Sequence, residues 1–412
     1  MARLAIVALF FTTTAVAPFS ALAHTQTQAC PPPGATCAIV PRSPHTLFLP
    51  EVRGPAAFAF LPSFKISVDP TAHADYGLAY PVTYRFTLPP GSSDLSVYRR
   101  TTPDGPWTFV PKKTSADFFN GVEAVRFDYA ARRAFVSVAF GAASDDIYLA
   151  IVDSNGVRVP AEFEMIAWYY DARAAAVVVT GDDESDWAHE PFLLAYQAFT
   201  AAHIWFTSAI NTGVLNDSGW ADVQTYVDQG YVEPACHSRT HPLLPYPDYD
   251  SEIGGCSTDI KERLDVPYPK GSTEYVTAYI DPSGYSNSTV RAKLGQYKYL
   301  TERSVDKDVH TFTAWNASDG LYARTGMSIC GDGRGSPFLN DLFDTVTAQH
   351  GIYHLYLHPW RNDWSEGAPI RRHINHIKGR KDIWYVGYGH LYLYHFVQER
   401  GTVTVTPLDA HE

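Results

Sequence analysis

The chain has 412 residues, of which 45% are hydrophobic and 18% charged, and its formal net charge is -12. This is the composition of a globular protein, and the length favours two domains. The acidic balance, together with the absence of any run of five or more Lys and Arg residues, excludes the electrostatic footprint of a nucleic-acid-binding protein.

The N-terminus has the pattern of a secretory signal peptide over residues 1–23. Arg3 is followed by an apolar stretch that ends in Ala21-Leu22-Ala23. Thr12-Thr13-Thr14 and Pro18 interrupt the apolar stretch, and no later stretch reaches about 18 apolar residues, so we expect no membrane span. Cleavage after Ala23 would give a secreted or periplasmic protein.

All five cysteines lie beyond this cleavage point, and disulfides are expected in an oxidising compartment. "CPPPGATC" closes a short, stiff loop, so Cys30–Cys37 is the first expected bridge. Cys236–Cys256 is the second. Cys330 is then free or paired elsewhere.

Residues 24–55 are rich in proline and weakly periodic, so we expect a tail or linker there. Residues 56–160 read as short strands separated by turn signals such as "PPGSSD" and "DSNG". The strand-like segments are "YPVTYRFTL", "LSVYRR", "WTFVP", "AVRFDYA", "AFVSVAF" and "DIYLAIVD". This rhythm predicts a β-sandwich accessory domain.

Over residues 161–412, apolar strand-like runs alternate with longer helical patterns, which favours a parallel α/β domain. "AAVVVTG" is followed by the helix-like "HEPFLLAYQAFTA" and then by "HIWFTSA". In "SGWADVQTYVDQG", Ser218 is a candidate cap of a helix that ends at Gly230. In barrels built from such units, functional residues follow the carboxyl ends of the strands. The polar clusters of this chain lie at such positions.

The first polar cluster follows an apolar run in "AVVVTGDDESDW", residues 176–187. Asp182, Asp183, Glu184 and Asp186 are crowded together there, although like charges repel one another. A solvated turn could carry these side chains without any function. A bound cation would favour the crowding, because its charge stabilises adjacent carboxylates.

The second cluster, "ACHSRTHP", contains His237 and His241. Their spacing of four places both imidazoles on the same side of one helical turn. Two histidines and one carboxylate, for which Asp183 is the candidate, leave open positions on a metal ion. Alone, H-x-x-x-H is more often coincidence than a metal site. The third element is His358 at the end of the apolar run in "LYLHPW", a position that in isolation reads as a core residue.

In this order, "TGDDE", "HSRTHP" and "LYLHP" resemble the motifs of the polysaccharide deacetylases, the family 4 carbohydrate esterases. The resemblance covers about residues 172–400. It implies a distorted (β/α) barrel of about seven strands, here preceded by the β-sandwich. It also implies one divalent metal ion, most commonly Zn²⁺, with Co²⁺ or another divalent ion as alternatives, and an acetylated polysaccharide as the substrate.

The resemblance assigns roles to five residues of this chain. Asp182 corresponds to the general base and His358 to the general acid. Asp183, His237 and His241 correspond to the metal ligands.

Three more residues are candidates for contacts with the substrate or with the oxyanion of the reaction. Gly284 and Tyr285 follow a strand-like run in "YIDPSGY" and could offer a backbone N–H group to the oxyanion. Trp315 is the nearest candidate for an aromatic residue that walls the pocket in the family. Trp187 and Trp360 also lie close to motifs, where they could stack on sugar rings.

The chain departs from the family pattern in ways that make it a divergent member. Gly181 stands where the family has an aromatic residue, and Glu184 stands where it has a glycine. "YIDPSGY" lacks the arginine with which the family orients its base. Arg239 or Arg303 could substitute for it.

These observations predict a secreted, metal-dependent hydrolase that removes acetyl groups from an N- or O-acetylated polysaccharide of the chitin, peptidoglycan or xylan type. A metal ion lowers the pKa of its bound water to about 7 and polarises the carbonyl group. Proton transfer by Asp182 and His358 would add about 10²–10⁴-fold.

The alternative is a carbohydrate-binding or cell-surface protein that has lost catalysis on the same fold. The missing arginine favours this alternative, whereas the retention of Asp182 and His358 favours the enzyme. A serine hydrolase would need G-x-S-x-G, and "GMSICG" lacks the last glycine. A glycosidase could use pairs of carboxylates but would leave His237 and His241 unexplained.

Overall fold

The computed structural model describes residues 62–68, 80–114, 121–140, 146–266, 276–305, 322–325, 327–328 and 336–405. The predicted signal peptide, the Pro-rich tail, the predicted Cys30–Cys37 bridge, Cys330 and Trp315 lie outside the described residues. Among the helices that are described, none has the length and apolar character needed to cross a membrane.

The described chain before residue 167 forms antiparallel strands in two sheets, and each of the six predicted segments contains a strand. One sheet has the order β18-β1-β7-β3-β4 and the other the order β5-β6-β2-β8. The strands are β1 (Phe64–Ser67), β2 (Val82–Thr87), β3 (Ser96–Arg100), β4 (Thr108–Val110), β5 (Ala124–Asp128), β6 (Arg133–Val138), β7 (Asp146–Val152), β8 (Glu162–Ile166) and β18 (Thr402–Val405).

Side chains from both antiparallel sheets share one hydrophobic core. In β1, buried residues alternate with partly exposed ones, as in a strand that has one face on a core. The ring of Phe64 in β1 lies 4.5 Å from the ring of Phe86 in β2, measured between centroids. β18, near the end of the chain, pairs with β1. The predicted domain boundaries and the sandwich arrangement of these sheets stay predictions.

A parallel sheet carries the rest of the described strands, in the order β14-β13-β12-β11-β10-β9-β16-β15, with β17 paired to β9. All of the pairings in this sheet are parallel. Its strands are β9 (Ala175–Glu184), β10 (Phe206–Ile210), β11 (Val232–Cys236), β12 (Ala278–Ile280), β13 (Thr301–Val305), β14 (Tyr322–Thr325), β15 (Met327–Ser328), β16 (Ile352–Leu357) and β17 (Ile383–Tyr385).

The strand β9 lies at the centre of the parallel sheet and pairs with β10, β16 and β17. All ten of its residues are buried. A continuous apolar run such as Ala175 to Val179 is typical of a parallel strand that is covered on both faces. The predicted α/β class with a parallel sheet is confirmed, and the closure of the sheet into a barrel stays a prediction.

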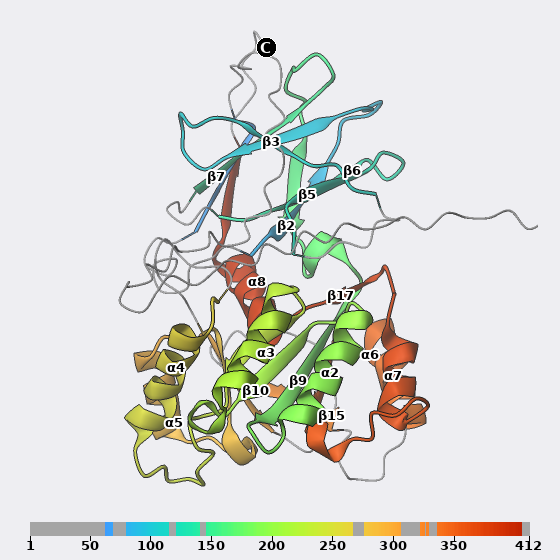
Figure 1. The fold of residues 1–412 in the computed structure, drawn as a ribbon. Coiled ribbons are helices and arrows are strands. Elements are labelled where there is room, and N and C mark those ends of the chain that lie inside the picture. Colours follow the sequence, from blue (N-terminus) through green and yellow to red (C-terminus); the bar gives the residue numbers. More distant parts are fainter. Residues whose placement is uncertain are drawn as a thin grey trace, which may run out of the picture. The chain divides into compact units, whose positions relative to one another are not determined.

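Helices connect the parallel strands. They are α2 (His189–Ala201), α3 (Asp217–Asp228), α4 (Cys256–Arg263), α5 (Ser288–Gln296), α6 (Ser336–Ala348), α7 (Pro369–Ile377) and α8 (Tyr388–Arg400). The helix α2 packs on β9 and β10, and α3 packs on β11 and on α2 (Figure 1). The short helical turn η1 (Tyr170–Ala172) precedes β9, and η2 (Thr212–Val214), η3 (Asp250–Gly255), η4 (Pro282–Gly284) and η6 (Pro359–Arg361) lie between the helices along the chain.

The helix α2 covers the segment "HEPFLLAYQAFTA" that the sequence predicted. The cap predicted for α3 was wrong. Asn216, not Ser218, caps this helix, because its side-chain Oδ1 accepts a hydrogen bond from the Gly219 N–H at 2.9 Å. Ser218 lies inside the first turn and donates its hydroxyl to the same Oδ1.

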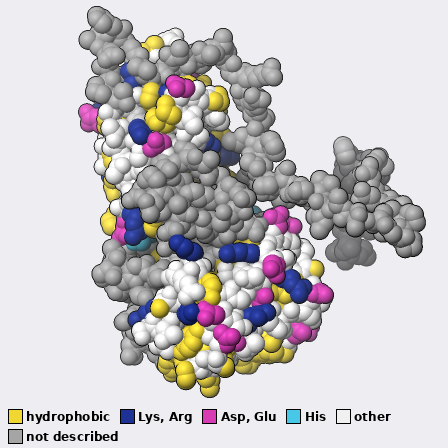
Figure 2. Space-filling view, turned by 90° about the vertical axis from the view of Figure 1, so that its left-hand side faces the viewer, with side chains coloured by type: hydrophobic (Ala, Val, Ile, Leu, Met, Phe, Trp, Pro, Cys, Tyr) yellow, Lys and Arg dark blue, Asp and Glu magenta, His cyan; other side chains and the backbone are white. Residues whose placement is uncertain are grey.

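Charged side chains on the described part of the face in Figure 2 are mixed, with Lys and Arg interspersed among Asp and Glu. Arg263 and Asp217, 2.5 Å apart, are an example of an exposed ion pair in this protein. Each such pair contributes only about 0–1 kcal/mol, because water screens the charges. The stability of the fold therefore comes mainly from the buried cores.

Candidate metal centre

The carboxyl ends of three parallel strands carry the side chains that the sequence singled out. Asp183 lies at the end of β9, His237 and His241 follow β11, and His358 follows β16. β16 and β10 flank β9, and β11 pairs with β10, so these strand ends meet at one edge of the sheet. One ligand atom from each of Asp183, His237 and His241 lies within 4.8 Å of the others. The structure thus brings the three predicted metal ligands together.

The Asp183 carboxylate is the centre of this cluster. Its Oδ1 lies 3.3 Å from Nε2 of His237 and 3.3 Å from Nε2 of His241. Burial raises the pKa of Asp183, but the hydrogen bond with His237 and the charges of the surrounding histidines outweigh burial and hold the pKa below its ordinary value. Two imidazole nitrogens and one carboxylate oxygen are a donor set that suits zinc, with a position left for water.

The two histidines lie on a bent loop, and the predicted helical turn was wrong. β11 ends at Cys236, and residues 237–241 contain no helix. Ser238 and His241 both have left-handed backbones, with φ of 60° and 57°. The Ser238 hydroxyl oxygen accepts a hydrogen bond from the His241 N–H at 3.0 Å, a local bond that competes with helical bonding. This closed turn brings the two imidazole rings to 5.0 Å between centroids.

The His237 ring is fixed by a hydrogen bond on the side away from Asp183. Its Nδ1 donates to the backbone oxygen of Ile280 at 2.8 Å, so Nε2 faces Asp183 and carries the lone pair once the ring is neutral. The His237 backbone is held too, because its N–H donates to Ile210 and its oxygen accepts from Asn211. Only 1% of His237 is exposed. The tautomer and the orientation that a metal ligand needs are therefore already set.

The candidate base Asp182 pairs with Arg303 from β13. Nη2 of Arg303 donates to Oδ2 of Asp182, and Nη1 donates to the Thr180 hydroxyl at 3.0 Å. Both Arg303 and Asp182 are buried. Of the two candidate substitutes for the missing arginine, Arg303 is therefore the one that contacts Asp182. The other candidate, Arg239, binds Asp259 instead, with Nε 2.8 Å from Oδ2.

The remaining acidic side chains of the cluster point to separate partners. Glu184 is fully buried, and its carboxylate contacts Nδ1 of His189 at 2.6 Å and accepts from the Tyr196 hydroxyl at 3.0 Å. Burial raises the pKa of Glu184 to about 7, and the bond with Glu184 raises the pKa of His189 to about 9. Asp186 accepts from the Asn216 N–H at 2.6 Å. The crowding in the sequence is resolved because each carboxylate faces a different group.

Gly181 has a steric cause. A Cβ atom at this position would lie 2.1 Å from Cζ of Phe206, the first residue of β10. The Phe206 ring fills the space where a side chain would stand. Glycine therefore lets the end of β9 pack closely on β10 beside Asp182.

The candidate acid His358 lies on the opposite side of the Asp183 carboxylate oxygens from the two ligand histidines. Its Nε2 is 3.6 Å from Oδ2 of Asp183, whereas His237 and His241 approach Oδ1. Nε1 of Trp360 donates to the same Oδ2 at 3.2 Å. Burial lowers the pKa of His358, against the nearby carboxylates, which raise it. The largely exposed Trp187 packs edge-on against Trp360, with ring centroids 5.1 Å apart.

The residues predicted to contact the oxyanion lie in a tight turn. The Gly284 N–H donates to the backbone oxygen of Asp281 at 2.9 Å, and the Tyr285 N–H donates to that of Pro282 at 3.4 Å. Both N–H groups thus take part in bonds inside the turn, which gives no support to an oxyanion role. The Tyr285 side chain is exposed. Trp315 lies outside the described residues.

Sequence analysis assigned no role to two residues that contribute to the site. Thr180, the first residue of "TGDDE", supplies a hydroxyl that bonds Arg303. Glu252, in η3, lies outside the motifs and accepts hydrogen bonds from the backbone N–H groups of Arg239 and Thr240. Each acts through a neighbour that is close only in the folded chain.

No protein-family model matches this chain, and neither does any curated protein. Solved structures do match it. A family 4 carbohydrate esterase from Streptomyces lividans is 20% identical, with a TM-score of 0.33, and the match covers 50% of this chain and 87% of that one. A family 4 acetyl xylan esterase from Clostridium thermocellum, in complex with a cobalt ion, is 14% identical, with a TM-score of 0.35 and coverage of 53% and 90%.

A third match is a mutant of a family 4 pseudoenzyme with restored enzymatic activity, at 14% identity, a TM-score of 0.37 and coverage of 53% and 67%. All three of these proteins are described as members of carbohydrate esterase family 4.

Proposed function

We propose that this chain is a metal-dependent deacetylase that removes acetyl groups from an N- or O-acetylated polysaccharide. One observation carries the proposal. Asp183, His237 and His241 present ligand atoms to one point, while a second carboxylate, Asp182, is held beside them by Arg303. A site that only bound metal would need neither Asp182 nor its buried arginine.

In this proposal Asp182 acts as the general base. Arg303 engages its Oδ2, whereas Oδ1 is buried and has no hydrogen-bond partner in the part of the chain that the structure describes. A buried carboxylate oxygen without a partner is costly unless another group binds it. We propose that this oxygen accepts the proton of the attacking water.

The metal ligands are Asp183, His237 and His241, and the donor set favours Zn²⁺, with Co²⁺ or another divalent ion as alternatives. When bound there, the ion would supply a water of lowered pKa and would polarise the acetyl carbonyl. The Nδ1 bond of His237 to Ile280 keeps Nε2 available for this role. The Trp360 N–H holds the second oxygen of Asp183, which fixes the plane of that carboxylate.

In this proposal His358 acts as the general acid. Its Nε2 lies on the Oδ2 side of Asp183, and its side chain is partly open to solvent, as substrate access requires. Burial lowers its pKa, which favours release of the proton once His358 carries one. The proton would go to the nitrogen or oxygen that leaves when the acetyl group is cleaved.

We further propose that the protein is exported, with its signal peptide cleaved after Ala23. The Cys236–Cys256 disulfide in the structure fits an oxidising compartment. This bridge was the second of the two expected from the sequence, and it is confirmed. The substrate would then be a polysaccharide of the chitin, peptidoglycan or xylan type outside the cytoplasm.

The decisive experiment measures metal content and acetate release together. The wild-type protein is stripped with a chelator, reloaded with Zn²⁺ or Co²⁺, and assayed on chitin oligomers, peptidoglycan and acetylated xylan. Asp182→Asn is measured alongside. We expect the variant to bind the metal as the wild type does but to release acetate about 10²–10⁴-fold more slowly. Metal binding without acetate release by the wild type on any of these substrates would contradict the proposal.

A carbohydrate-binding protein without catalysis is the second candidate. The lack of the expected arginine was its main support. The structure weakens that support, because Arg303 forms an ion pair with Asp182. Arg303 lies on β13, the strand next to β12, which overlaps the "YIDPSGY" segment that lacks the arginine.

A further inference from the structure

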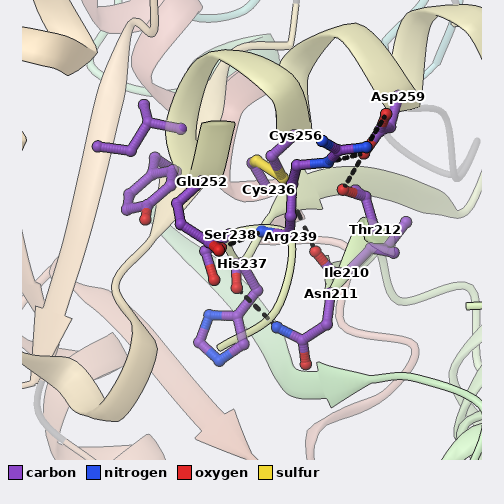
Figure 3. The surroundings of a disulfide bond; sticks show 12 residues. Ile210, Asn211, Thr212, Cys236, His237, Ser238, Arg239, Glu252, Cys256 and Asp259 are labelled. Carbon is purple, nitrogen blue, oxygen red and sulfur yellow. Dashed lines mark hydrogen bonds and ion pairs between the residues drawn. A yellow bond between two sulfur atoms is a disulfide. The ribbon is translucent and has the colours of Figure 1, made fainter. Parts of the chain in front are cut away.

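The histidine loop, residues 237–242, is anchored by a carboxylate that is not a metal ligand. Oε2 of Glu252 accepts hydrogen bonds from the N–H groups of Arg239 and Thr240, both at 2.9 Å. Its Oε1 accepts from the Thr240 hydroxyl at 2.7 Å. Glu252 is itself buried. Figure 3 shows it beside Ser238 and Arg239, at the base of the loop.

The two ligand histidines depend on this loop to different degrees. His237 has its own contacts, through the ring bond to Ile280 and the backbone bond from Asn211. Among the described residues, the hydrogen-bond and ion-pair partners of the His241 ring are Asp183 and the backbone of His241 itself. Its position therefore depends on the backbone of the loop. That backbone is left-handed at both Ser238 and His241, a conformation that persists only where neighbouring groups hold it.

A covalent ring encloses the whole arrangement. The Cys236–Cys256 disulfide joins the end of β11 to the first residue of α4, 20 positions later. His237, His241 and Glu252 all lie between the two cysteines. An ion pair holds the loop as well, because Arg239 binds Asp259 of α4. Oδ2 of Asp259 also accepts a hydrogen bond from the Thr212 hydroxyl at 2.6 Å (Figure 3). Glu252 is thus tied to the strand whose end carries the ligands.

We propose that Glu252 is a positioning residue of the metal centre, which holds His241 in its ligating position through the backbone of Arg239 and Thr240. The inference rests on the proposed function, because it assumes that His241 binds a metal. It assigns to Glu252 no contact with the metal or the substrate. Partners that orient a ligand in this way typically change metal affinity by about 10–100-fold when they are removed.

Glu233 offers a matched control for Glu252. It lies near the start of β11, the strand whose end leads into the histidine loop. Glu233 is also buried, and its carboxylate also accepts two backbone N–H bonds, from Gly389 at 2.9 Å and His390 at 3.0 Å. It also accepts from two threonine hydroxyls, those of Thr207 at 2.8 Å and Thr277 at 3.5 Å. These bonds hold the start of α8, β10 and Thr277 rather than the histidine loop. The loss of a buried carboxylate that accepts several hydrogen bonds can therefore be compared at the histidine loop and away from it.

The experiment measures the affinity of the full chain for Zn²⁺ by competition with a chromogenic chelator, and the visible spectrum of the Co²⁺ form. We expect Glu252→Ala to weaken Zn²⁺ binding about 10–100-fold and to alter the Co²⁺ spectrum. We expect Glu252→Gln to stay close to the wild type, because its amide oxygen can accept both N–H bonds and its NH₂ group can donate to Thr240. Glu233→Ala should lower the melting temperature but leave the affinity and the spectrum unchanged.

If Glu252→Ala does not fold, Glu252→Asp serves in its place. Its carboxylate is one methylene short of the loop, so weaker binding than in Glu252→Gln is expected. Wild-type affinity and an unchanged spectrum in the folded Ala or Asp variant would overturn the inference, as would an equal loss in Glu233→Ala. A wild-type chain that binds neither Zn²⁺ nor Co²⁺ would overturn the proposed function as well, so the two failures are distinguishable.

Discussion

Arg303 donates a hydrogen bond to the carboxylate of Asp182 from a strand 121 positions further along the chain. The guanidinium is fully buried and also bonds Thr180, so both partners are fixed in one geometry. Removing one partner of a buried ion pair is costly, because the remaining charge is then neither paired nor hydrated. It lies beside the three proposed metal ligands, and the proposed reaction depends on it more than metal binding alone would.

The first prediction concerns this pair. Arg303→Lys keeps the charge but loses the planar donor group that reaches Asp182 and Thr180 together. We expect kcat to fall by about 10²-fold, while the affinity for Zn²⁺ stays as in the wild type. Steady-state kinetics on the best substrate and a metal titration would test this. An unchanged kcat would mean that Arg303 is structural only.

The second prediction separates the general acid from the ligands. His358→Ala should retain the metal and lose about 10²–10⁴-fold in kcat, because the group that protonates the leaving atom is gone. His241→Ala should lose affinity for the metal itself. Chelation should also lower the melting temperature of the wild type, since a ligand present at 100 times its Kd stabilises a fold by about 2.7 kcal/mol. The metal content of the two variants tests this, because His358→Ala should contain as much metal as the wild type and His241→Ala should contain less.

The third prediction concerns the close packing of Gly181 against Phe206. The Cβ of Gly181→Ala would lie 2.1 Å from the Phe206 ring, so the strand must shift. We expect a loss of about 1–3 kcal/mol in the free energy of unfolding. Gly295→Ala is the control, because nothing lies within 4 Å of its added Cβ and alanine favours a helix. Chemical denaturation of both variants would show whether the cost belongs to the contact.

The fourth prediction concerns stability in acid. His373 is fully buried between Asn340 and Tyr353, and burial lowers its pKa to about 3. In the unfolded chain this histidine binds a proton near pH 6.5, whereas in the folded chain it does so only near pH 3. The stability that the neutral ring contributes is therefore fully present above pH 6.5 and is lost as the pH falls toward 3. The slope should approach about 1.4 kcal/mol per pH unit. Denaturation of the wild type and of His373→Gln from pH 7 to pH 4 should show a smaller slope in the variant.

The fold and the site differ in how much of each the sequence predicted. The strands, the helix α2 and the Cys236–Cys256 bridge were predicted, because hydrophobic periodicity and cysteine spacing are local signals. The helical turn predicted at His237 was wrong, because a serine hydroxyl and two left-handed residues replace the helical bonds. The cap of α3 moved from Ser218 to Asn216 by two positions, which is within the usual uncertainty of a helix end.

By itself, the sequence determined which side chains could form a metal centre, since Asp183, His237 and His241 each follow a strand and have the chemistry of ligands. It named Arg303 only as one of two possible substitutes for a missing arginine. The tertiary structure decided between them, because the parallel pairing of β12 with β13 places Arg303 at the same sheet edge as Asp182, whereas Arg239 is engaged by Asp259. Contacts between strands depend on how the sheet is assembled, and no local pattern of residues records that.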